Sequence, residues 1–283
     1  LGGSAASAAP AERIEPPEQV QDWLQRDKLN HERETLGFYL SGHPIDAYRD
    51  IIDQVCSDRL RPLIAQHGQP PVVGADGKTQ WQPRQKVMFA AWVTDVRFFK
   101  GDKSAEGKGG RASYKLTFDD QTAQLSTWID VDAWPRLAPI VKLDNLVFVI
   151  AEIGASPARE GRESEPRMYR AEFYTLSDVL RDYPQRISLE WRKPLAEVQA
   201  LHKALKPHAA PAGVAIVLHY LNGKQACTLD LPPEWKLRLD EASLTVLQQI
   251  AGPDCVKVSY RRYMPPATER RFERAYAGGG DDE

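Results

Sequence analysis

The feature that most constrains the fold is a run of five β-strand patterns between proline- and glycine-rich segments. A short helical or irregular piece at residues 131–138 separates the third pattern from the fourth. The five patterns cover residues 87–99, 113–118, 123–129, 146–153 and 168–174. Five strands with a helix in that place are the order of an OB-fold barrel. We therefore predict an all-β OB-fold barrel over residues 86–182.

The region before the barrel divides by composition. Small residues and prolines predict a linker at 1–18, apolar periodicity predicts a helical segment at 19–66, and prolines and glycines predict a second linker at 67–85. Leu36, Tyr39 and Leu40 have helical spacing, and Gly42 followed by Pro44 predicts the end of that helix. Further apolar positions predict another helix at 45–55.

The region after the barrel changes character. Strand patterns at 187–191, 214–220, 226–231 and 256–260 alternate with helical patterns at 195–205 and 244–251. Asn222-Gly223 predicts a hairpin between the second and third strands. The order β-α-β-β-α-β fits a small α+β domain of ferredoxin-like type at 183–276, before a disordered tail at 277–283. The predicted fold class is therefore multi-domain: a helical segment, an OB-fold barrel and a small α+β domain.

Bulk composition excludes several classes of protein. The net charge is −2, so attraction to phosphate has to be local. The three cysteines show no C-x-x-C spacing, which argues against a disulfide framework or a zinc site. The longest apolar run, at 146–151, falls far short of the ~20 residues that span a membrane. We expect a cytoplasmic protein without membrane contact.

The loop between the first two strands is the best candidate binding site. It combines a local excess of basic residues with four glycines, which suits a flexible contact to a phosphate backbone, although each cation is equally compatible with a solvated surface loop. The basic residues are Arg97, Lys100, Lys103, Lys108, Arg111 and Lys115.

Nearby aromatic residues are candidates for base stacking. Strand alternation places Lys115 and Trp128 on the same polar face, where Trp128 is either a stacking platform or packed under a helix. Phe98 and Phe99 stand at the mouth of the loop, and one of them has to face outward.

No catalytic constellation is present in the sequence. Asp130 and Asp132 form a D-x-D pair, but Asp132 is placed to cap the short helix that follows. Asp119-Asp120 is typical of a turn, and the histidines are scattered. We expect no catalytic residue and no metal site.

The segment ERETLGFYLSGHPI, residues 32–45, resembles a block of the bacterial DNA polymerase III alpha subunit that lies just before an OB domain. The LTFDD turn at 116–120 is also similar to that family's pattern. The resemblance covers nearly the whole chain and is weakest beyond residue 187. It implies the carboxy-terminal region of a replicative polymerase, whose catalytic domains, using Mg²⁺, lie before residue 1.

The resemblance also implies partners. The barrel is expected to bind single-stranded template DNA. The last domain is expected to bind the tau subunit of the clamp loader, within the polymerase III holoenzyme. Residues proposed for the tau surface are Trp235, Leu237, Arg261, Arg262 and Tyr263, which fit a protein core equally well.

Three other functions remain as alternatives. The near-neutral barrel favours a replisome interaction module without direct DNA contact. An aminoacyl-tRNA synthetase OB domain would require class II motifs after residue 176, and none occurs. A nuclease using Asp130 and Asp132 would require metal-dependent cleavage.

Overall fold

The computed structural model describes residues 25–37, 39–70, 72–73, 79–80, 84–101, 111–156, 164–223 and 225–265. The chain divides into two compact units, Leu1–Pro44 and Ile45–Glu283. The linker predicted at 1–18, the tail predicted at 277–283, and Lys103 and Lys108 lie outside the described residues.

The first unit contains helix α1, Gln25–Leu36. The helix predicted to run through Leu36, Tyr39 and Leu40 to Gly42 is wrong: α1 ends at Leu36, because Gly37 adopts φ 79° and turns the chain. Glycine enters this left-handed region without steric cost. The Gly37 N–H donates to the Arg33 carbonyl at 3.0 Å, which closes the last turn. Leu36 and Leu40 are left exposed instead of forming one buried stripe.

Glu32 organises the segment after α1. Its carboxylate accepts the backbone N–H groups of Ser41 at 2.9 Å and Leu40 at 2.7 Å. These bonds hold the pKa of the Glu32 carboxyl below its ordinary value. The first glutamate of the 32–45 block thus has a structural role: it fixes the turn at Leu40 and Ser41.

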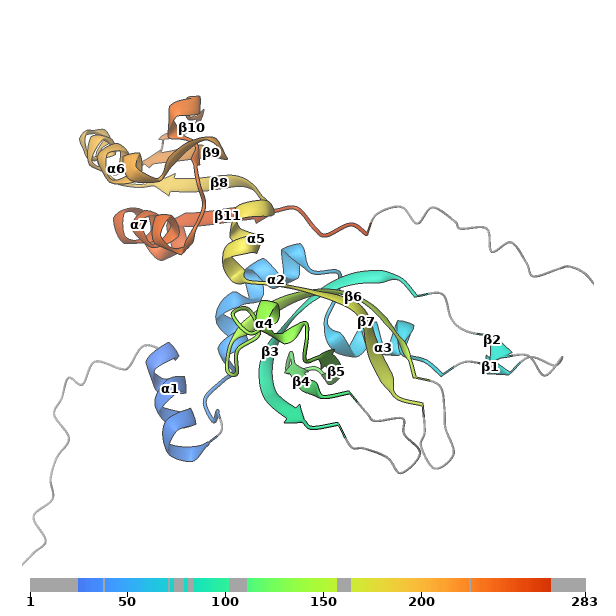
Figure 1. The fold of residues 1–283 in the computed structure, drawn as a ribbon. Coiled ribbons are helices and arrows are strands. Elements are labelled where there is room, and N and C mark those ends of the chain that lie inside the picture. The colour runs from blue at the N-terminus through green and yellow to red at the C-terminus, as the bar shows by residue number, and fades with distance from the viewer. Residues whose placement is uncertain are drawn as a thin grey trace, which may run out of the picture. The chain divides into compact units, whose positions relative to one another are not determined.

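Five antiparallel strands form the barrel of the second unit (Figure 1). They are β3 (Lys86–Phe99), β4 (Ser113–Asp119), β5 (Gln124–Asp130), β6 (Leu146–Ala155) and β7 (Pro166–Tyr174). Their order is β5-β4-β3-β6-β7. The strands at the two ends of this sheet, β5 and β7, contact each other, so the sheet curves into a barrel. Helix α4, Trp134–Leu137, lies between the third and fourth strands, as predicted. The structure is thus mostly β-sheet with a barrel of OB type.

Two details of the barrel region differ from expectation. Helix α4 begins after Ala133 without a side-chain cap, so the capping role predicted for Asp132 is wrong. Helix α5, Leu176–Asp182, was not predicted. It is marked by a capping box, in which Thr175 and Asp178 exchange hydrogen bonds between side chain and backbone.

Burial changes along β3. Residues 87–91 are buried on both faces: Phe89 belongs to the barrel interior, and Met88 belongs to a second core outside it. Beyond Val93 burial declines, and the last three residues are exposed. Residues 87–91 of β3 thus pack against a core on each face. The last residues of the strand have one face that neither of the described cores covers.

Short helices precede the barrel. They are η1 (Pro44–Tyr48), α2 (Arg49–Val55) and α3 (Leu60–His67), followed by a two-stranded ladder of β1 (Val72–Val73) and β2 (Thr79–Gln80). Ile45, Ile51, Ile52 and Val55 are buried in the second core, as their spacing predicts.

The carboxy-terminal part is a four-stranded sheet. Its strands are β8 (Pro184–Trp191), β9 (Ala209–Asn222), β10 (Gln225–Asp230) and β11 (Val256–Tyr260). Its helical elements are η2 (Leu195–Glu197), α6 (Val198–Leu205), η3 (Lys206–His208), η4 (Pro233–Trp235), α7 (Glu241–Ala251) and η5 (Pro253–Cys255). The β-α-β-β-α-β element order and the hairpin at Gly223 are confirmed.

The ferredoxin-like pairing predicted for this sheet is wrong. The observed order is β10-β9-β8-β11, in which β8 and β9 are adjacent and parallel. A ferredoxin-like split βαβ unit would separate these two strands by another strand. Here the hairpin strand β10 is added on the outside of β9, which makes it an edge strand.

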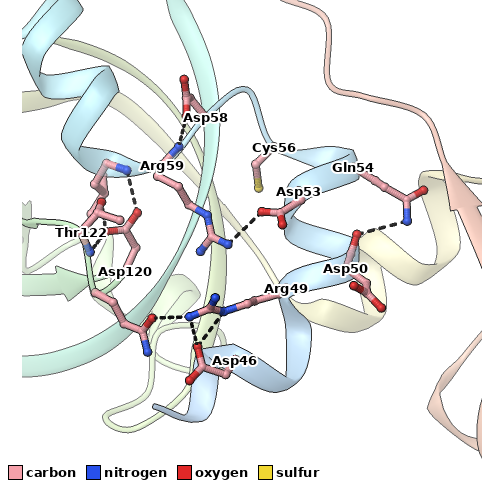
Figure 2. Close-up of polar contacts among 12 residues, drawn as sticks. Asp46, Arg49, Asp50, Asp53, Gln54, Cys56, Asp58, Arg59, Asp120 and Thr122 are labelled. Carbon is pink, nitrogen blue, oxygen red and sulfur yellow. Dashed lines mark hydrogen bonds and ion pairs between the residues drawn. The ribbon is translucent and has the colours of Figure 1, made fainter. Parts of the chain in front are cut away.

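Asp120 joins the barrel to the helices before it (Figure 2). It is fully buried, and one carboxylate oxygen accepts the Leu60 N–H at 2.7 Å, at the start of α3. The other oxygen accepts the Thr122 hydroxyl at 2.6 Å and the backbone N–H groups of Thr122 and Ala123 at 2.9 and 3.1 Å. The turn predicted at Asp119-Asp120 is therefore confirmed, and its second carboxylate caps a helix sixty residues earlier.

We predict that Asp120→Asn lowers the free energy of unfolding by at least about 2 kcal/mol, because it replaces one acceptor oxygen with an NH2 donor that faces other donors, so that a buried hydrogen bond is lost. Denaturant unfolding measures this change. Asp119→Asn is the matched control: its carboxylate accepts bonds only at the exposed side of the same turn. Equal losses for the two variants would contradict the role of Asp120.

Candidate nucleic-acid interface

The uncovered face of β3, β4 and β5 brings together residues far apart in the sequence. Arg97, Lys115 and Trp128 lie directly opposite one another in the strand register. Neighbouring strands are about 4.8 Å apart, so the three side chains form one row across the sheet. The prediction that Lys115 and Trp128 share a face is confirmed. The outer face is defined by Asp95, Arg97, Phe99, Ser113, Lys115, Thr117, Ser126, Trp128 and Asp130.

Two aromatic rings on the outer face contact each other. The rings of Phe99 and Trp128 are 4.9 Å apart between centroids and tilted by 59°. Trp128 is 47% exposed and Phe99 is 41% exposed. A tilted contact at this distance leaves no slot for a base between the rings. A base would therefore stack on the free side of the indole.

Phe98 is also exposed, but on the opposite face of the strand. Its ring lies 5.1 Å from that of Tyr114, which stacks on Trp134 at 4.1 Å. The sequence required one of the two phenylalanines to be exposed, and both are, on opposite faces of β3. Phe98 belongs to a second aromatic cluster, beside α4.

The cations of the candidate site fall into three groups. Arg97 and Lys115 lie on the outer face, and Lys100 and Arg111 are exposed where the first loop leaves the strands. Lys103 and Lys108 lie outside the described residues. The Arg97 guanidinium is 2.8 Å from the Asp95 carboxylate, a partner that the sequence reasoning missed.

The residues proposed for a partner surface are mostly engaged within the second unit. Leu237 is 1% exposed, which corrects its assignment to an exposed surface. Trp235 packs on the second core with its ring 4.5 Å from His202. Arg262 donates to the carbonyls of Cys56 and Ser57.

Arg261 and Tyr263 also make contacts within this unit. Arg261 lies over the Tyr183 ring and donates to the Asp182 carbonyl at 3.0 Å. The Tyr263 N–H donates to the Val55 carbonyl at 2.8 Å, and its side chain packs on the second core. The exposed feature of the carboxy-terminal part is instead β10, all six residues of which are exposed.

Outside the outer face, the described residues include side chains of metal-ligating types and a buried cysteine. Among the described residues no group of three or more His, Cys, Asp or Glu side chains could hold a metal ion. Burial raises the pKa of the Cys56 thiol, so this cysteine is no nucleophile. Within the described ranges no helix is long and apolar enough to cross a membrane.

Sequence comparison finds several curated proteins that share one name. No family model matches the chain. Over 271 residues, 94% of the chain, it is 24% identical to "DNA polymerase III subunit alpha" of Xylella fastidiosa. The same-named proteins of Halalkalibacterium halodurans and Escherichia coli K12 are 25% and 22% identical over 87% of the chain. The chain is similar to DNA polymerase III alpha subunits over most of its length. The resemblance predicted from residues 32–45 is thus confirmed.

The aligned part is a small share of those polymerase subunits. The chain spans about a fifth of the length of the curated relatives it matches: 21%, 20% and 20% for the three named here. The activity and partners of a whole DNA polymerase III alpha subunit therefore come to this chain only as proposals.

Comparison with solved structures gives weak superpositions. RecG bound to a three-way DNA junction covers 58% of the chain and 20% of its own, with 12% identity and a TM-score of 0.27. A replication protein A heterotrimer bound to single-stranded DNA covers 56% of the chain and 37% of its own, with 12% identity and a TM-score of 0.24. At these scores the likeness supports no argument about function.

We predict that Trp128→Ala lowers the free energy of unfolding by no more than about 1 kcal/mol, because about half of the indole is exposed and its ring contact is with the exposed Phe99. Phe118→Ala, from the barrel interior of the same sheet, should cost about 3–5 kcal/mol. Denaturant unfolding of both variants measures the difference. A loss above about 3 kcal/mol for Trp128→Ala would show that this side chain belongs to the core.

Proposed function

We propose that this chain is a non-catalytic, carboxy-terminal part of a replicative DNA polymerase alpha subunit and binds single-stranded template DNA through the outer face. The Mg²⁺-dependent nucleotidyl transfer belongs, in this proposal, to the polymerase domains before residue 1. A cytoplasmic location and assembly with the other polymerase III subunits are parts of the same proposal.

The observation that carries the proposal is the exposed Trp128–Phe99 pair beside Arg97 and Lys115. Exposed aromatic rings next to cations are how OB barrels hold single strands, because every base has a face to stack and every linkage has a phosphate. The relationship to DNA polymerase III alpha subunits supplies the biological setting.

Binding of a labelled single-stranded oligonucleotide tests the proposal. We expect binding at low salt, with a log–log salt slope of about −0.7 for each phosphate contacted. Trp128→Ala should weaken binding by about 5- to 150-fold, because stacking is worth about 1–3 kcal/mol per base. Lys115→Ala should reduce the magnitude of the slope by about 0.7.

Matched controls come from the connection between α4 and β6. Leu143→Ala removes an apolar side chain that is 53% exposed, and Lys142→Ala removes an exposed cation of the same barrel. Neither should change the affinity appreciably. No binding at low salt, or equal affinity of Trp128→Ala and wild type, would refute the assignment of the outer face to DNA.

A second proposed activity is binding of the tau subunit by the carboxy-terminal part. It is supported by β10, an exposed edge strand to which an extended segment of another protein can add. Leu229, at 45% exposure, is the large apolar side chain that this strand presents.

We predict that Leu229→Arg weakens tau binding at least about tenfold if β10 is the contact, because a charge is then buried in the interface. Leu143→Arg, a similarly exposed position of the barrel, is the control and should leave tau binding unchanged. Surface plasmon resonance with the full chain measures both affinities. Unaltered binding by Leu229→Arg would place the contact elsewhere.

A further inference from the structure

An acidic side chain lies in the middle of the candidate DNA-binding face. Asp95 precedes Arg97 by two residues on β3, so both point to the outer face. One Asp95 carboxylate oxygen is 2.8 Å from the Arg97 guanidinium. The Arg97 side chain is 70% exposed and that of Asp95 is 34% exposed, so both can reach a ligand on this face.

Among the described residues, the cation that the structure pairs with Asp95 is Arg97. Across the sheet, Asp95 lies opposite Thr117, which in turn lies opposite Ser126. The hydroxyls of Thr117 and Ser126 lie 3.1 Å apart, within hydrogen-bonding distance. Among the nine residues that define the outer face, the acidic ones are Asp95 and Asp130 and the basic ones are Arg97 and Lys115. Asp119 lies on the same side at the end of β4, so the described part of this side of the sheet carries no excess of positive charge.

This arrangement determines how much Arg97 can contribute to binding a polyanion. A phosphate gains from a cation mainly by releasing the counterions condensed on the nucleic acid. A guanidinium already neutralised by a carboxylate has to exchange partners, and the displaced carboxylate then repels the phosphate. Because the pair is exposed, it contributes little stability of its own, and a phosphate can displace the carboxylate. The pair therefore attenuates binding without preventing it.

We propose that Asp95 is an affinity-setting residue of the outer face: paired with Arg97, it lowers the affinity for single-stranded nucleic acid. This inference rests on the proposed DNA-binding function and identifies a residue that sets the affinity of that binding. Asp95 acts through Arg97, so it contacts no base and reads no sequence. Its effect is on the strength and salt dependence of binding.

A double-mutant cycle on the full chain tests the proposal, with a labelled single-stranded oligothymidylate as the probe. Asp95→Asn should tighten binding about two- to tenfold and make the log–log salt slope more negative by up to about 0.7, because one more cation becomes available. In an Arg97→Ala background the same substitution should change the affinity less than twofold. Glu234→Gln, an exposed position of η4, makes the same change in net charge and should have no effect.

Each other result has a distinct meaning. Weaker or unchanged binding by Asp95→Asn, with wild-type binding still sensitive to Trp128→Ala, would overturn this inference and leave the proposed function standing. Equal tightening with and without Arg97 would also overturn it, because Asp95 would then act only by its own charge. No binding by any variant would overturn the inference and the proposed function together. Circular dichroism of each variant confirms that the fold is retained.

Discussion

The arrangement of the second unit depends on the hydrogen bonds that the backbone N–H and C=O groups of residues 55–60 make with other parts of the chain. This junction segment connects α2 to α3, and its polar groups would otherwise be buried without partners. Asp120 accepts the Leu60 N–H from the barrel side, and Met88 exchanges two hydrogen bonds with Ser57. From the other side, Arg262 donates to two of its carbonyls. The barrel and the residues after β11 are therefore fixed to the same short stretch of chain.

This constraint also decides which surface of the barrel stays open. The second core contains α2 residues together with Met88, Ala90 and Phe148 of the barrel strands, so the first half of β3 is covered on its outer side. The outer side of the second half has no such cover, and there the strand presents exposed Arg97 and Phe99. The location of the candidate site follows from where the junction segment and its core end. It does not require a cleft.

The sequence predicted what depends on strand alternation and missed what depends on pairing partners. Lys115 and Trp128 were placed on one face correctly, because a period of two is local. The order of elements after residue 183 was also right, but which strand lies beside β8 depends on long-range packing. Leu237 was taken for a surface residue because its burial depends on that same packing. Asp95 was missed because it precedes Arg97, the first basic residue of the predicted binding loop, although the same alternation rule places it on the face of Arg97.

The energetics of the outer face favour a weak interaction. One stacked base is worth about 1–3 kcal/mol, and of the two cations on the outer face Arg97 is paired. Stacking alone, at about 3 kcal/mol, corresponds to a dissociation constant weaker than about 1 mM. Such a site is useful where another part of a longer protein already holds the strand, because tethering raises the effective concentration to the millimolar range. In the proposed function, a weak, sequence-independent contact would also let the strand advance by one base at a time. Asp95 would keep the contact in that range, since an unpaired Arg97 would hold the passing phosphates more tightly.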